Sequence, residues 1–190
     1  MAKPSVAAII ASTRPQRHGP LIGQWVIDTL ADQKAFEVSL VDLADYGLPL
    51  LDEPEPAQSR AYIHDHTKAW SQTIDRADGF IMVLSEHNWS MPASVKNALD
   101  CLYWEWQHKP IGFVSYSGGM SGGIRAVEMT KQVATTLSML VINAMVNLPR
   151  IDSLIVDDNF HPPCGATDAL HALADDLEKY LAASALLHTA

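Results

Sequence analysis

The chain alternates short apolar runs with longer segments in which apolar residues recur every three or four positions. Such runs are typical of strands covered on both faces, and the periodic segments are typical of amphipathic helices. The predicted strands span residues 6–11, 37–41, 80–84 and 111–116, with a less sharply bounded one within 140–148. This alternation predicts a parallel β-sheet with helices on both of its faces.

Five helical stripes accompany these strands, and the third of them runs from Val95 through Leu99 to Trp106. Five strands and five helices in 190 residues fit a single α/β domain, residues 1–190. The expected architecture is a doubly wound sheet of the flavodoxin type, with strand order 2-1-3-4-5. Because ligands of such sheets bind beyond the carboxyl ends of the strands, the functional site is expected in the loops after the first, third and fourth strands.

Charge and cysteine content exclude several classes of protein. Thirteen basic and twenty-two acidic residues give a net charge of -9, which repels a phosphate backbone and argues against a nucleic-acid partner. The only cysteines, Cys101 and Cys164, have no spacing of a disulfide framework or zinc site, and we expect a reducing cytoplasm. The apolar stretch 137–148 is shorter than the roughly 20 residues of a membrane span, so no membrane partner is expected.

The loop after the first predicted strand concentrates hydroxyl groups and guanidinium groups before a Gly-Pro helix start. A phosphate there would receive the helix's first N–H groups, the hydroxyl of Ser12 or Thr13, and the forked donors of Arg14 or Arg17. The alternative is an ordinary solvated turn with surface arginines. Neither a P-loop nor a GxGxxG pattern follows this strand, which disfavours nucleoside triphosphates and dinucleotides of the Rossmann type.

The two other loops at this expected edge also contain residues suited to ligand binding. In the segment 85–92, His87, Asn88 and Trp89 offer an apolar face and hydrogen bonds to a flat heteroaromatic ligand. A capped helix entry with Trp89 in the core or in an interface is the alternative. The segment 117–123 contains four glycines, which let a backbone approach a ligand closely or simply form a flexible turn.

Three stretches, IIASTRPQRHG, SEHNWSMPASVKNALDCL and KPIGFVSYSGGMSGGIRA, resemble the NADPH-dependent FMN reductase family, which includes quinone, azo and chromate reductases on a flavodoxin-like fold. The resemblance implies bound FMN, with NAD(P)H as co-substrate. It implies that the FMN phosphate is held by Ser12, Arg14, His18 and neighbouring backbone such as Gly19, with Arg17 assisting. It also implies that Ser85, Glu86, His87, Asn88 and the backbone of Ser117, Gly118 and Gly119 line the isoalloxazine ring.

The middle motif departs from the family's usual Pro-Glu-Tyr-Asn, since this chain has Ser85-Glu86-His87-Asn88 followed by the bulky Trp89. A titratable imidazole therefore replaces a tyrosine near the expected flavin, and we expect His87 and Trp89 to make this a variant site.

The sequence thus predicts an FMN-dependent NAD(P)H oxidoreductase that passes electrons to a quinone-like or other small acceptor. Because the cofactor supplies the chemistry, no catalytic side chain is named. Two alternatives stay open: a flavodoxin-like electron carrier, and a flavin-free binding or regulatory protein on the same fold.

Two further clusters, one of aromatic residues and one of histidines, bear on the oligomeric state and on metal binding. Tyr103, Trp104 and Trp106 span more than one face of the predicted third helix, which one core does not bury, and we expect a homodimer or a dimer of dimers. His64 and His66 are two residues apart in a predicted helix and would point from different faces, so no metal site is expected.

Overall fold

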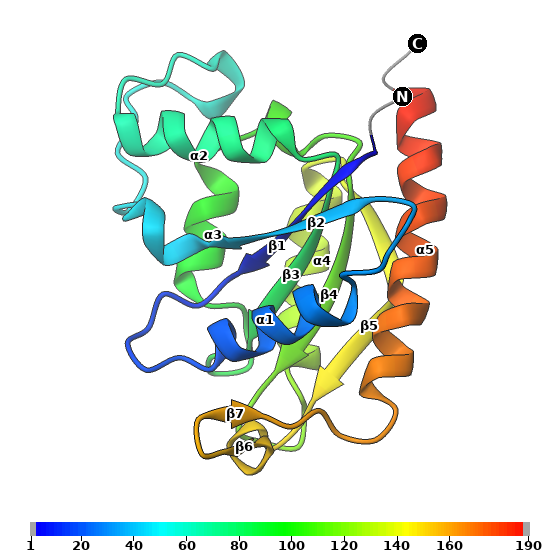
Figure 1. Cartoon of the computed structure of the whole chain (residues 1–190). Coiled ribbons are helices and arrows are strands. Elements are labelled where there is room, and N and C mark those ends of the chain that lie inside the picture. The colour runs from blue at the N-terminus through cyan, green and yellow to red at the C-terminus, as the bar shows by residue number, and fades with distance from the viewer. Residues whose placement is uncertain (1–2, 188–190) are drawn as a thin grey trace.

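The computed structural model describes residues 3–187, and its main sheet has the parallel strand order β2-β1-β3-β4-β5 (Figure 1). The strands are β1 (Ser5–Ile10), β2 (Glu37–Asp42), β3 (Gly79–Ser85), β4 (Pro110–Tyr116) and β5 (Leu140–Leu148). The predicted fold class and strand order are confirmed. Every residue of β3 and β4 is buried, which explains why these two strands read as continuous apolar runs.

Helices cover both faces of the sheet (Figure 1). They are α1 (Gly19–Thr29), α2 (Asp65–Arg76), α3 (Ala93–Asp100), α4 (Ile124–Thr136) and α5 (Ala166–Leu187). Short 3-10 turns are η1 (Leu43–Tyr46), η2 (Ala57–Ser59), η3 (Trp104–Trp106) and η4 (Ile151–Leu154). Apolar residues of α1 and α5 pack on one face of the sheet, and those of α2, α3 and α4 pack on the other.

The period of two in β1 divides its side chains between these two cores. Ala7 and Ile9 pack in the core formed with α2, α3 and α4, whereas Val6 and Ala8 pack in the core formed with α1 and α5. The last helix also approaches the sheet closely, because a Cβ at Gly112 of β4 would lie 3.0 Å from Cδ2 of Leu173. The absence of a side chain at Gly112 therefore lets α5 seat on the centre of the sheet.

The third helix is shorter than its apolar stripe predicts, because it ends at Asp100 and Trp106 belongs to the separate turn η3. Trp106 is fully buried, with its ring 5.1 Å from that of Phe80, and Tyr103 is half-buried. Only Trp104 of the three aromatic residues is exposed, at 47%. The core therefore buries Trp106 but not the whole cluster, because the chain leaves the helix after Asp100, turns Trp106 inward and leaves Trp104 exposed.

A small antiparallel hairpin, β6 (Ile155–Val156) and β7 (Asn159–Phe160), lies between β5 and α5 (Figure 1). The ring of Phe160 meets that of Trp25 on α1 edge to face, with centroids 5.4 Å apart. Sequence periodicity did not predict this hairpin, because two-residue strands have no measurable period.

His64 and His66 lie together, contrary to the sequence-based expectation. His64 precedes the first residue of α2 and has an extended backbone, so the two imidazole rings stack with centroids 5.2 Å apart. Nε2 of His66 lies 3.2 Å from Oδ1 of Asp52. Within residues 3–187, no cluster of three or more His, Cys, Asp or Glu side chains is arranged to hold a metal ion. None of the described helices has the length and apolar character needed to cross a membrane.

Candidate functional site

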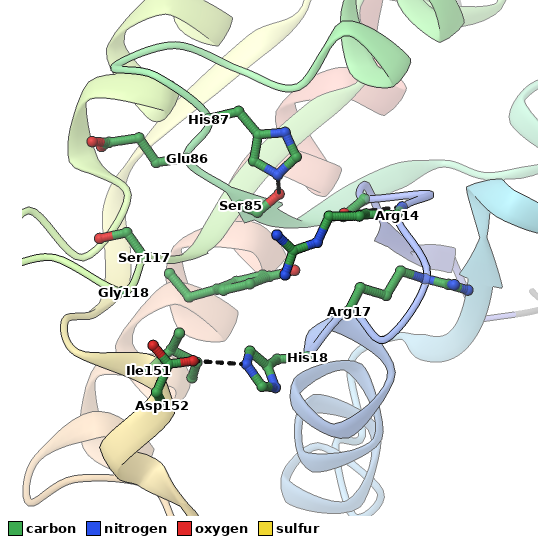
Figure 2. A pocket seen from close by; sticks show the side chains of 12 residues that line it. Arg14, Arg17, His18, Ser85, Glu86, His87, Ser117, Gly118, Ile151 and Asp152 are labelled. Carbon is green, nitrogen blue, oxygen red and sulfur yellow. Dashed lines mark hydrogen bonds and ion pairs between the residues drawn. The ribbon is translucent and has the colours of Figure 1, made fainter.

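The loops after β1, β3 and β4 meet η4 at the carboxyl edge of the sheet and enclose an open pocket of about 210 Å³ (Figure 2). The sequence-predicted residues that line this pocket are Ser12, Arg14, Arg17, His18, Ser85, Glu86, His87, Ser117 and Gly118. The predicted residues that do not line it are Gly19, Asn88, Trp89 and Gly119. The volume is below the roughly 300–1,000 Å³ that encloses a drug-sized ligand, so a larger ligand would extend past the rim.

The loop between β1 and α1 supplies the cationic side of the pocket. Arg14 points into the pocket, and its guanidinium makes no hydrogen bond or ion pair to the rest of residues 3–187 that the structure describes (Figure 2). Arg17 extends away from Arg14 and is paired with the Asp42 carboxylate at the end of β2. Arg14 therefore has no counter-ion among the described residues, whereas the charge of Arg17 is balanced by Asp42.

His18 and Asp152 close the pocket on the side of α1. Nε2 of His18 lies 3.0 Å from Oδ1 of Asp152, whose side chain is otherwise exposed (Figure 2). Asp152 and its neighbour Ile151 belong to η4, which follows β5, and sequence reasoning missed both. The signal was available, because β5 is parallel to β4 and its carboxyl end therefore reaches the same edge.

Tyr116, the last residue of β4, is a further lining residue that the sequence analysis did not single out. Its buried hydroxyl and the buried Nε of Arg17 have no hydrogen-bond partner among the described residues. Burial raises the pKa of Tyr116, and the Ser85 side chain, the nearby guanidinium groups of Arg14 and Arg17 and the backbone of Gly19 oppose that rise. An unpaired buried hydroxyl is costly, and a phosphate or another acceptor-rich group entering the pocket would satisfy that of Tyr116. The residues present therefore fit a phosphate-bearing ligand.

The loop after β3 makes a tight turn over His87, Asn88, Trp89 and Ser90. The backbone N–H of His87 donates to the carbonyl of Ser90 at 2.9 Å, and the N–H of Ser90 donates back at 3.0 Å. Asn88 and Trp89 have φ values of 49° and 69°, which is the left-handed conformation that both central residues of a type I′ turn require. A bulky residue there is uncommon and costs about 1–2 kcal/mol. The turn directs Trp89 outward, where it is 70% exposed.

His87 itself faces the pocket, with Nε2 3.4 Å from the hydroxyl oxygen of Ser85 (Figure 2). Burial lowers the pKa of His87, and the positive charge of Arg14 lowers it further. The ring is therefore biased toward its neutral form, in which one ring nitrogen donates a hydrogen bond and the other accepts one.

Glu86 connects the loop after β3 to the start of α4. Its Oε1 accepts hydrogen bonds from the Ser121 hydroxyl at 3.0 Å and from the Arg125 guanidinium at 3.2 Å. Its Oε2 accepts one from the backbone N–H of Arg125 at 3.2 Å. The guanidinium carbon of Arg125 lies 3.9 Å from the centroid of the Trp89 ring. Sequence reasoning missed Arg125, because nothing in the chain order shows that it lies beside Trp89.

Close packing within the glycine-rich loop fixes the pocket wall at Tyr116. Its positive φ values occur at Gly122 and Gly123, and a Cβ at Gly123 would lie only 2.7 Å from the backbone nitrogen of Tyr116. The carbonyl of Gly119 accepts hydrogen bonds from the N–H of Arg150 and the Ser117 hydroxyl, outside the pocket lining. Gly19 has a comparable packing role, since a Cβ there would lie 2.7 Å from Cγ2 of Ile10.

Comparison with known proteins identifies relatives of the chain. The model of the family described as NADPH-dependent FMN reductase matches residues 4–152. An NAD(P)H-dependent FMN reductase of Schizosaccharomyces pombe is 42% identical over 151 residues, which are 77% of this chain and 74% of the relative. A quinone reductase of Pseudomonas putida is 29% identical over 140 residues, covering 71% of this chain and 72% of the relative.

A solved structure agrees with the fold. The flavoenzyme NAD(P)H:(acceptor) oxidoreductase of Paracoccus denitrificans has a TM-score of 0.75 over 95% of this chain and 98% of its own, at 17% identity. Since the family match extends from β1 to η4 and the Schizosaccharomyces pombe relative is similar over most of both chains, this chain belongs to the NADPH-dependent FMN reductase family.

Proposed function

We propose that the pocket between the β1, β3 and β4 loops is the FMN site of this FMN-dependent NAD(P)H oxidoreductase. The observation that carries the proposal is the Arg14 guanidinium, which points into the pocket without a partner among the described residues, together with the buried Tyr116 hydroxyl, which also lacks a hydrogen-bond partner there. Arg14, Ser12 and His18 would bind the phosphate at the start of α1. Ser85, His87 and the backbone at Ser117 and Gly118 would hold the ring system.

When bound, FMN supplies the redox chemistry by accepting a hydride from NAD(P)H and returning the electrons to an acceptor. The side chains of the pocket bind and orient the reactants, and none of them is needed as a nucleophile. His87 lines the part of the pocket where the ring is expected and is biased toward its neutral form, so it is the residue that would hold or donate a proton there.

We infer a quinone-like acceptor from the similarity to a quinone reductase, and family membership favours the enzyme over an electron carrier or a flavin-free protein. Steady-state oxidation of NAD(P)H with a benzoquinone by the purified protein tests this inference. A protein that binds FMN but does not sustain turnover would be the electron carrier.

The FMN site is tested by comparing FMN with riboflavin, which lacks the phosphate. Replacing Arg14 with Ala should weaken FMN binding by about 1–3 kcal/mol, the contribution of a charged hydrogen bond, and weaken riboflavin binding far less. Arg76→Ala, which removes an exposed guanidinium at the end of α2, is the matched control and should leave both affinities unchanged. Equal losses for FMN and riboflavin in Arg14→Ala would contradict the phosphate assignment.

We also propose that the protein is a cytoplasmic homodimer or dimer of dimers that associates through an apolar surface beside the pocket. Large exposed apolar side chains occur on and before α4, namely Met120, Ile124 and Met129, and Trp104 of the predicted aromatic cluster is exposed as well. Sedimentation at micromolar concentration should show a dimer or tetramer, and Met129→Glu should dissociate it. A monomeric parent protein would refute this proposal.

A further inference from the structure

Trp89 combines two unfavourable features that the fold itself does not require. Its side chain is 70% exposed to water, and its backbone is in the left-handed region with φ of 69°. Exposed indoles gain nothing from burial, and bulky residues rarely adopt this conformation. Strained residues that persist in a structure cluster at binding and catalytic sites. We therefore expect the indole of Trp89 to have a function.

Contacts from the first turn of α4 fix the orientation of this indole. The guanidinium of Arg125 stacks on one side of the ring, with Cζ 3.9 Å from the ring centroid. Arg125 is held in turn by Glu86, whose side chain is only 7% exposed and also accepts a hydrogen bond from Ser121. The ring is thus a fixed platform supported from α4.

The platform stands at the rim of the proposed FMN site. Glu86 and His87 line the pocket, and Trp89 follows two residues later without lining it. Since one face of the indole is stacked on Arg125 and most of the residue is exposed, the remaining ring surface is open to a ligand. Because Arg125 pairs with Glu86, which lines the pocket, a ligand that extends past the rim on this side would meet this surface.

The chemistry of the platform selects the kind of ligand. An open indole face stacks on a flat heteroaromatic ring. The Arg125 guanidinium uses NH1 for Glu86, and its Nε and NH2 make no hydrogen bond to other described residues, so these donors suit a phosphate. A purine next to a phosphate presents both features at once.

We propose that Trp89 and Arg125 bind the adenosine 2′-phosphate end of NADPH, with Trp89 stacking on adenine and Arg125 binding the 2′-phosphate. This inference rests on the proposed function, which places the nicotinamide end of the same molecule in the pocket. It makes the two residues the determinants of preference for NADPH over NADH.

Binding of two fragments to the FMN-loaded protein tests the proposal. The probes are 2′,5′-ADP, which has the 2′-phosphate, and 5′-ADP, which lacks it, and calorimetry measures both affinities. The parent should prefer 2′,5′-ADP by about tenfold or more, and Arg125→Gln should abolish that preference. Trp89→Gly, which the left-handed backbone accepts, should weaken both fragments by about tenfold.

Matched variants and the FMN affinity separate the possible outcomes. Lys131→Gln removes another cation from α4. Trp104→Ala removes an exposed indole that belongs to η3 and not to the turn after β3. Neither variant should alter fragment binding. A parent without preference, an Arg125→Gln protein that keeps the preference, or Trp89→Gly with parental affinities would overturn the proposal. FMN affinity is measured separately in the parent and in each variant. A parent protein that does not bind FMN would reject the proposed function rather than this inference.

Discussion

At the scale of single residues, burial in the pocket and the positive charge of Arg14 both change the pKa of His87. Burial lowers the pKa of His87 below its ordinary value of 6.5, and Arg14 adds to this effect. When the folded-state pKa is depressed, the unfolded chain takes up the proton first as the pH falls. The stability contributed by neutral His87 is therefore present above pH 6.5 and is lost as the pH falls from there toward the folded-state pKa.

This linkage predicts that part of the protein's acid sensitivity originates at His87. Urea unfolding of the flavin-free protein at about pH 7.5 and about pH 5.5 should show a larger loss of stability for the parent than for His87→Tyr. The other histidines are common to both proteins, so the difference isolates position 87. Arg14→Ala should also reduce the loss, because it removes the second cause of the depressed pKa. Identical losses in all three proteins would show that His87 does not have a depressed pKa.

At the scale of elements, the turn after β3 reverses the usual effect of glycine on stability. Alanine keeps its Cβ in the left-handed conformation of residue 89, whereas glycine adopts it without strain. Trp89→Gly should therefore be more stable than Trp89→Ala by about 0.5–1 kcal/mol, even after the greater entropy of glycine in the unfolded chain. Denaturant titration of the two variants measures this difference. An alanine variant as stable as the glycine variant would mean that the turn relaxes to another conformation.

The glycine-rich loop before α4 contains one glycine that has no room for a side chain and another that does. A Cβ at Gly123 would lie 2.7 Å from the nitrogen of Tyr116 and 2.8 Å from Cβ of Ser115, at a φ of 89°. Gly123→Ala should cost about 1–3 kcal/mol of unfolding free energy and weaken FMN binding, because the pocket wall at Tyr116 must shift. A Cβ at Gly119 meets nothing within 4 Å, so Gly119→Ala should stay within about 0.5 kcal/mol of the parent. Similar losses in the two variants would argue against a specific clash at Gly123.

At the scale of the whole molecule, we propose that residues 1–190 form one cooperative unit that includes α5, although the family match ends at residue 152. Leu173 of α5 is fully buried against β4. Leu173→Ala should cost about 2–5 kcal/mol and lower the stability of the entire fold. Leu187→Ala, at a position that is 49% exposed, is the matched control. Far-UV circular dichroism and tryptophan fluorescence should report one coincident transition, and separate transitions would show that α5 unfolds independently.

Much of this architecture follows from the order of residues alone. The alternation of buried runs and periodic segments predicted the five-stranded parallel sheet, because strands covered on both faces and amphipathic helices leave distinct signatures in the chain. The strand order followed from the flavodoxin-type architecture that this alternation indicated. The same order indicated that Arg14, Ser85 and Ser117, which lie far apart in sequence, line one pocket. The rule that loops at the carboxyl ends of parallel strands share one edge is sufficient for that inference.

Other features were decided only by the tertiary structure. The pairing of Arg17 with Asp42, the contact of His18 with Asp152 and the stacking of Arg125 on Trp89 each join side chains from different parts of the chain. The burial of Trp106 depends on a chain turn after Asp100 that a helical stripe does not record. A sequence pattern reports which face of its own element a residue occupies. Which side chain it meets across a loop depends on the packing of elements that share no local signal, and only the folded structure contains that information.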